Sequence, residues 1–190
     1  AHVDASGAES ELRAHETVLA TGGYANDRSV TSLLQRYRPD LYALPTTNGA
    51  WATGDGMKMA MEIGAASVDM EHVQVHPTGF VDPADANSST KVLCGEMMRG
   101  VGGILLTPVG ERFVDELKPR DKVVAAEAAT GASEFALVLS AAAAEEAGRH
   151  VELYLHKGLL VKLDGTPALA AWMGAASRGG ASADMAALRA

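Results

Sequence analysis

Cysteine is nearly absent from this chain, and basic residues are fewer than acidic ones. The 190 residues include one cysteine, Cys94, so neither an internal disulfide nor a multi-cysteine metal site can form. Lys and Arg number 16 against 24 Asp and Glu, which gives a formal net charge of −8. Binding to nucleic acid needs a basic surface, so we expect no nucleic-acid partner.

Long apolar runs are also missing. No segment approaches the roughly 20 apolar residues of a membrane span, and the first residues lack the basic and apolar parts of a signal peptide. We therefore expect no membrane span, and the lone cysteine is typical of a soluble protein in a reducing intracellular compartment. The chain begins with Ala1 inside a predicted strand, so we expect it to be a piece of a longer protein.

Aromatic residues make up 5% of the chain, whereas hydrophobic residues as a whole make up 47%. This balance, carried by Ala, Val, Leu and Gly, is typical of an α/β domain. The patterns GxGxxG and GxxxxGK[ST] are both absent, so neither the usual dinucleotide fingerprint nor a phosphate-binding P-loop is expected. ATP chemistry is therefore not expected.

Apolar spacing and turn residues predict short elements along the chain. The predicted strands and hairpins are a hairpin within 1–16, strands at 18–20, 68–75 and 135–139, and a hairpin pairing 104–106 with 112–114. The predicted helices cover 29–37, 57–64, 122–130 with Asp121 as its cap, 166–174, and a last one capped by Ser182.

Two glycine-rich turns follow or precede predicted elements. Thr21-Gly22-Gly23 follows the strand at 18–20, and Thr53-Gly54-Asp55-Gly56 precedes a helix. Glycines let a backbone approach a ligand closely, and a helix N-terminus attracts anions and polar rings. An ordinary tight turn and a capping role for Asp55 explain the same residues equally simply.

A few polar residues stand at places suited to chemistry. His76 ends a predicted strand, and Glu96 and Arg99 share one side of a helical turn. Arg120 stands beside Asp121 at the start of a predicted helix, where the helix dipole disfavours a cation, and such an unfavourable placement is often found at functional sites. A satisfied polar histidine and surface ion pairs are the simpler explanations. His72 does not form a metal pair with His76, because they lie on a predicted strand without a third ligand.

Several longer stretches, taken together, resemble the soluble FAD-dependent fumarate reductase flavoproteins, and most of all their yeast and trypanosomatid branch. The stretches are ATGGYANDR at 20–28, TTNGAWATGDG at 46–56, VQVHPTGF at 73–80, EMMRGVGGILL at 96–106 and GERFVDELKPRD at 110–121. The resemblance implies an α/β fold made of part of an FAD-binding Rossmann-like domain, at 1–114, and part of an α+β capping domain, at 115–190.

The resemblance also implies a reaction, in which hydride passes from the flavin N5 to one olefinic carbon of fumarate and the other is protonated, giving succinate. Arg120 would deliver the proton, and Glu96 with Arg99 would relay it. The implied substrate-binding residues are His76, Gly95 and Glu96. The implied FAD-binding residues are Ala20, Thr21, Gly22, Gly23 and Asp55.

The sequence departs from the family at Gly95, where many bacterial members carry Thr. A hydroxyl contact to the substrate is then missing, so a flavoenzyme reducing another α,β-unsaturated carboxylate is an alternative. The chain also lacks the family's upstream dinucleotide fingerprint and its downstream substrate-binding histidine and arginine, which leaves a non-catalytic fragment with a vestigial site as another alternative. The electron donor stays open, and NADH acting through a fused or separate reductase is one route.

Overall fold

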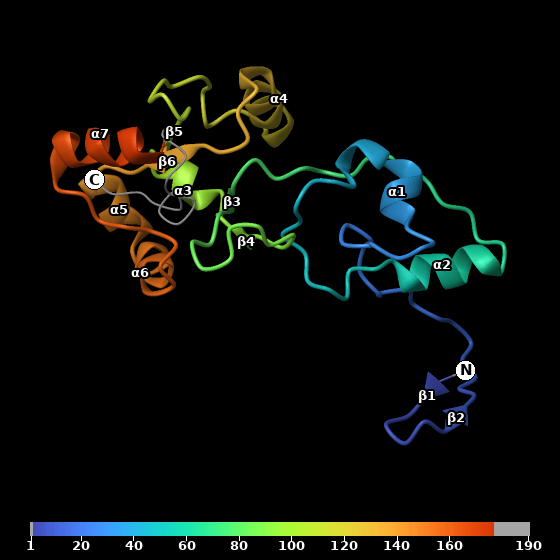
Figure 1. The fold of residues 1–190 in the computed structure, drawn as a ribbon. Coiled ribbons are helices and arrows are strands. Elements are labelled where there is room, and N and C mark those ends of the chain that lie inside the picture. The colour runs from blue at the N-terminus through green and yellow to red at the C-terminus, as the bar shows by residue number, and fades with distance from the viewer. Residues whose placement is uncertain (1, 177–190) are drawn as a thin grey trace.

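The computed structural model describes residues 2–176, and these residues mix helices with short strands (Figure 1). In the view of Figure 1, helices α1 and α2 lie on the right and α3, α5, α6 and α7 on the left, with β3 and β4 between them and α4 at the top. The strands are β1 (His2–Val3), β2 (Glu9–Ser10), β3 (Gly79–Phe80), β4 (Val92–Leu93), β5 (Ile104–Leu106) and β6 (Ala136–Val138). The helices are α1 (Leu33–Tyr37), η1 (Pro39–Leu41, a 3₁₀ helix), α2 (Asp55–Glu62), α3 (Met97–Gly100), α4 (Arg120–Thr130), α5 (Ala141–Ala147), α6 (Arg149–His156) and α7 (Gly165–Ala176).

The described strands form three two-stranded antiparallel sheets. β1 pairs with β2 as the predicted hairpin, and its tip carries Gly7 at a φ of 84°. β3 pairs with β4, placing Gly79 opposite Leu93. β5 pairs with β6, placing Leu105 opposite Leu137. The β3–β4 and β5–β6 pairings join segments that lie further apart in the sequence, so they position the loops on either side of them.

Buried apolar residues gather into two main clusters, one on each side of the molecule. The small core contains Tyr24, Leu33, Leu34 and Met70. The large core contains Phe80, Cys94, Met98, Leu105, Val123, Leu137, Leu139, Ala143, Ala147, Tyr154, Leu159 and Leu160. The large core therefore connects α3, α4, α5 and α6 with the β5–β6 sheet, and it supports the segments that carry the polar residues singled out above.

Two predicted strands were wrong. Residues 18–20 and 68–75 form no strand, and Val18 and Val68 are 86% and 85% exposed. An apolar stretch forms a strand only when a neighbouring strand can hydrogen-bond to its backbone N–H and C=O groups. No described segment pairs with either of these two stretches. Met70 instead turns into the small core, after Asp69 at a φ of 56°.

The predicted helices were closer to the structure. Ser32 caps α1 by accepting from the N–H of Gln35, so the helix starts later than predicted and leaves Val30 exposed. α2 begins at Asp55 rather than residue 57. Asp121 does not cap α4, because the helix starts one residue before it, after Pro119. Gly131 ends α4 with a left-handed φ of 72°, as its glycine predicted.

Other predictions were confirmed in part or fall outside the described residues. The strand at 135–139 and the helix at 166–174 correspond to β6 and α7. The hairpin after β5 is reduced to a single bridge between Leu106 and Arg112. Ser182 lies outside the described residues. Within residues 2–176, no helix is both long and apolar enough to cross a membrane.

Candidate active site

A carboxylate and a guanidinium from different segments meet at the start of α4. Arg120 is the first residue of that helix, and its Nε and Nη2 each donate to one carboxylate oxygen of Glu96 at 2.6 Å. Glu96 is the N-cap residue of α3. The Nη1 of Arg120 also donates to the side-chain oxygen of Gln74. The two-pronged contact fixes the orientation of both groups, since a planar guanidinium matches a carboxylate.

Arg99 lies behind this pair. Its side chain is 5% exposed, and its Nη2 stands 3.9 Å from Oε1 of Glu96. Its Nη1 donates to the carbonyl oxygen of Glu116 at 2.6 Å. Glu96 therefore lies between two arginines, one partly exposed and one buried, and the three residues predicted as a relay are brought together.

The electrostatics of the pair follow from this geometry. Hydrogen bonds from Arg120, and the charges of Arg120, His76 and Arg99, hold the pKa of Glu96 below its ordinary value, although some desolvation opposes them. The hydrogen bond to Glu96 in turn raises the pKa of Arg120. At neutral pH Glu96 is a carboxylate and Arg120 is a cation. The two groups therefore form a charged pair whose hydrogen bonds can carry a proton from one to the other.

His76 lies close enough to Arg120, Arg99 and Glu96 for their charges to affect its pKa. Its Nδ1 lies 3.0 Å from the carbonyl oxygen of Thr78 and 3.2 Å from the N–H of Thr78, which orients the ring. Burial lowers the pKa of His76, and the nearby charges of Arg120 and Arg99 lower it further. The ring is therefore neutral at pH 7 and can donate or accept a hydrogen bond.

Gly95 is held by a residue that sequence reasoning missed. The hydroxyl of Tyr154 in α6 accepts from the N–H of Gly95 at 3.3 Å and donates to the carbonyl of Leu93 at 3.1 Å. The ring of Tyr154 packs on Phe80 with a centroid distance of 4.6 Å. A Cβ added at Gly95 would meet the tyrosine oxygen at 3.7 Å, an ordinary contact, so packing does not force a glycine there.

The two glycine-rich turns lie against each other. The N–H of Gly54 donates to the carbonyl of Gly23 at 3.1 Å, and a Cβ at Gly56 would overlap the side chain of Thr21, with Thr21 Cγ2 at 2.6 Å. Gly22 and Gly54 take left-handed φ values of 79° and 71°. The positions that a Cβ would occupy on Gly22 and Gly23 have no atom within 4 Å. This bare backbone beside the N-terminus of α2 fits a flat ring or an anionic group.

A buried ion pair fixes the loop next to these turns, and it too was not predicted. Asp27 has no exposed surface, pairs with Lys58 of α2 at 2.8 Å and accepts from the N–H of Leu33 at 2.8 Å. Burial alone would raise the pKa of Asp27, but hydrogen bonds from Lys58, Ser29 and the Leu33 backbone lower it overall. Asp27 therefore joins α1 and α2. Ala20 and Asp55 are exposed, at the two ends of the paired turns.

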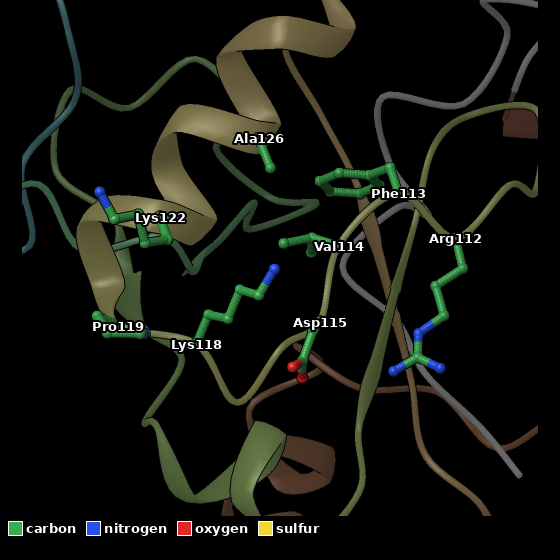
Figure 2. Close-up of a pocket in the computed structure, with 8 residues that line it drawn as sticks. All are labelled: Arg112, Phe113, Val114, Asp115, Lys118, Pro119, Lys122 and Ala126. Carbon is green, nitrogen blue, oxygen red and sulfur yellow. The ribbon is translucent and has the colours of Figure 1, made fainter.

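Two cavities lie near α4. The larger, about 930 Å³, lies between α4 and residues 112–115, with Lys118, Lys122 and Ala126 at its edge (Figure 2). It contains none of the predicted site residues. The other, about 370 Å³, is lined by His76, Thr78, Cys94 and Glu127 among others. The second cavity is the one adjoining the polar cluster. Within residues 2–176, no group of three His, Cys, Asp or Glu side chains could hold a metal ion.

Comparisons with known proteins identify relatives of this chain. The chain is 52% identical over 146 residues to the fumarate reductase of Schizosaccharomyces pombe, covering 77% of this chain and 28% of that protein. It is 40% identical over 116 residues to the NADH:fumarate oxidoreductase of Klebsiella pneumoniae, covering 61% of this chain and 12% of that protein. The chain thus spans about a quarter or less of these relatives.

A solved structure, the open conformation of a flavocytochrome c3 fumarate reductase, superimposes with a TM-score of 0.61 at 31% identity, over 87% of this chain and 27% of that one. The likeness confirms the predicted α/β class. A model of the FAD binding domain matches residues 1–176. On these grounds the chain belongs to the FAD binding domain family.

Proposed function

We propose that this chain forms part of an FAD-dependent fumarate reductase. The observation that carries the proposal is the placement of Glu96 between Arg120 and Arg99, with His76 electrostatically coupled to all three. A cluster that holds two cations and one neutral histidine suits a dicarboxylate substrate, since its charges must be balanced as the site excludes water. The named activities of the S. pombe and flavocytochrome relatives support this substrate.

The cofactor assignment rests on the paired glycine turns. Residues Ala20 to Gly23 and Asp55 would hold FAD, with the bare backbone of Gly22 and Gly23 allowing close approach. Bound and reduced, FAD supplies a hydride. The rest of the chemistry belongs to side chains of this chain, which must bind the substrate carboxylates and provide one proton.

The proton step uses the geometry around Glu96. Arg120 gives a proton to the substrate carbon as negative charge develops there. Glu96 starts as a carboxylate, so it first takes a proton from Arg99 and then passes one to Arg120 through the two short hydrogen bonds. Arginine is an unusual acid because its pKa is high, and the hydrogen bond to Glu96 raises that pKa further. The positive charge of the buried Arg99 nearby acts in the opposite direction, since like charges favour loss of a proton. His76 and Gly95 bind the substrate.

We further propose that electrons come from NADH through a fused or separate reductase. The support is the relative named NADH:fumarate oxidoreductase, which shares 116 aligned residues with this chain. The test is to add NADH to the full-length gene product in the absence of oxygen. Reduction of the flavin is measured as the loss of its absorbance. A flavin that stays oxidised with NADH but is reduced by dithionite would rule it out.

The central test is Arg120→Lys in the full-length gene product. Lysine keeps the positive charge but loses the two-pronged contact with Glu96, so we expect fumarate turnover to fall by a factor of at least about 100. The flavin content, measured by absorbance, should stay unchanged, because the side chain of Arg120 bonds to Glu96 and Gln74 and not to the glycine turns. Arg149→Lys is the matched control, since Arg149 is also the first residue of a helix and is exposed.

Three outcomes discriminate among the functions considered. Loss of turnover in Arg120→Lys alone supports the proposal. Wild-type turnover in that variant contradicts the role of Arg120. A wild-type protein that reduces another α,β-unsaturated carboxylate but not fumarate would keep the chemistry and change the substrate, as the glycine at position 95 allows.

A further inference from the structure

Two buried side-chain atoms have no hydrogen-bond partner among residues 2–176, and they are complementary. One is Nε of Arg99, a donor, and the other is Oε1 of Glu127, an acceptor. Buried polar atoms are normally paired, so each exception needs an explanation. Arg99 already belongs to the proposed relay, whereas nothing so far uses Glu127.

Glu127 stands on the same helix as Arg120. It follows Arg120 by seven residues in α4, which is about two helical turns, so both side chains leave the same side of the helix. Val123, between them, is fully buried in the large core. Glu127 therefore points toward the protein interior from α4, two turns after the proposed proton donor Arg120.

Arg99 and Glu127 also interact electrostatically. Burial raises the pKa of Glu127 to about 7, and the charge of Arg99 opposes that rise. The carboxyl group therefore titrates near neutral pH. Glu127 is the kind of group that can hold and release a proton in the range where the enzyme must work.

The cavity of about 370 Å³ supplies the other side of Glu127. Its volume is enough for several water molecules, and polar groups on its wall can bind them. The titratable side chains that share this wall with Glu127 are His76, Lys91, Cys94 and Glu134. Water in this cavity and the carboxyl group of Glu127 can exchange protons.

We propose that Glu127 holds a proton behind Arg99 and passes it to the Arg99–Glu96–Arg120 relay, drawing its replacement from water in the cavity. This inference rests on the proposed function and adds a residue to it. In this proposal Glu127 acts through Arg99 and not on the substrate directly. A water molecule, or a small movement of the side chains, would connect Nε of Arg99 with Oε1 of Glu127.

The proton balance is simple. Arg120 loses one proton to the substrate carbon and regains one from Glu96, which takes one from Arg99. Arg99 takes one from the carboxylic acid of Glu127, and the resulting carboxylate takes one from cavity water. One proton moves from water to substrate in each turnover, every protein group returns to its starting state, and no further oxidant or reductant is needed.

The test compares Glu127→Gln with Glu134→Gln in the full-length gene product. Glutamine keeps the shape of the side chain but cannot hold a transferable proton, so we expect fumarate kcat to fall about tenfold or more in Glu127→Gln. Glu134 lines the same cavity but has no unpartnered buried atom, so its variant should keep wild-type turnover. Flavin content should be unchanged in both.

A pH profile separates a proton-holding role from a structural one. A proton donor must be protonated, so wild-type kcat should decline as pH rises through about 7, the pKa of Glu127. Glu127→Gln should lose this inflection, and Glu127→Asp should restore part of it. His76 titrates separately, because its pKa is lowered below its ordinary value.

Infrared spectroscopy provides a readout independent of turnover. A protonated carboxyl band should be present at pH 6, decline through about pH 7, and be absent in Glu127→Gln. If that variant fails to fold, Glu127→Asp and the infrared titration of the wild type decide instead. Wild-type kcat and pH profile in a folded Glu127→Gln, or no such band in the wild type, would overturn the inference. Because Arg120→Lys is measured alongside, failure of the whole function is recognised separately.

Discussion

At the scale of single residues, the buried carboxylate of Glu116 organises the turn that follows β5. It is 3% exposed, accepts from the N–H of Leu105 at 2.8 Å and receives two hydrogen bonds from Arg112 at 3.1 and 2.6 Å. Burial would raise the pKa of Glu116, but the bonds from Arg112 and Leu105 outweigh it and lower the pKa. Its backbone carbonyl holds Arg99, so the same residue supports the relay.

We therefore expect Glu116→Gln to lower the free energy of unfolding by about 1–3 kcal/mol at pH 7, because a buried charged acceptor is replaced by a weaker one. The folded-state pKa is lowered, so the stabilisation is present above the unfolded-state pKa of about 4.3 and is lost as pH falls through the folded-state value. Urea unfolding at pH 7 and in acid measures both effects.

The control for this prediction is Glu111→Gln, since Glu111 is exposed on the same turn. It should change stability by less than about 0.5 kcal/mol. A difference between Glu116→Gln and wild type that stays constant down to strongly acidic pH would contradict the role of the Glu116 charge.

At the scale of elements, the N-terminus of α2 fits closely against the first glycine turn. A Cβ at Gly56 would overlap Thr21, so Gly56→Ala must push the two turns apart. We expect the variant to lose about 1–3 kcal/mol of stability and to retain less flavin in the full-length gene product. Gly100→Ala is the control, because a Cβ at that helical position meets nothing within 4 Å. Equal flavin retention in the two variants would contradict the proposed contact between α2 and the cofactor.

Helices were predicted from the sequence better than strands, and the physical reason lies in their hydrogen bonds. α2 and α4 satisfy their backbone within one segment, so apolar spacing and the glycines at 64 and 131 were enough to place them. A strand depends on a second segment. Residues 18–20 were apolar enough to suggest one but have no strand partner in the described structure.

At the scale of the whole molecule, Cys94 reports on the large core. It is 3% exposed, and burial raises the pKa of its thiol to about 12. At pH 8 the reactive thiolate is then about a thousandfold scarcer than in an unfolded chain, whose cysteine pKa is about 8.5. We expect iodoacetamide to label the folded protein at least about 100-fold more slowly than the protein in urea.

The measurement is the intact mass after timed labelling, and Cys94→Ser gives the background, since Cys94 is the only cysteine. Labelling of the native protein as fast as in urea would mean that the large core opens freely. The labelling rate against urea concentration then gives the stability of this core separately from that of the small core around Tyr24.

Sequence motifs predicted part of the candidate site and missed the residues that support it. Glu96, Arg99 and Arg120 were predicted together and lie together. Tyr154 and Glu127 were not predicted, because a tyrosine or a glutamate in a helix usually indicates only packing or solubility. Their importance depends on contacts with segments far away in the sequence. The predicted domain boundary at 114/115 and the roles of the individual site residues stay predictions.

The hydroxyl of Tyr154 bridges Leu93 and Gly95 across 61 and 59 positions of the chain. During synthesis, α6 must therefore leave the ribosome before the segment leading to Glu96 gains its final anchor. The residues proposed for chemistry are therefore synthesised before Tyr154, whose hydrogen bonds fix the backbone next to Glu96. A nascent chain stopped between α5 and α6 would already contain the relay residues Glu96, Arg99 and Arg120, yet the backbone before Glu96 would lack its brace.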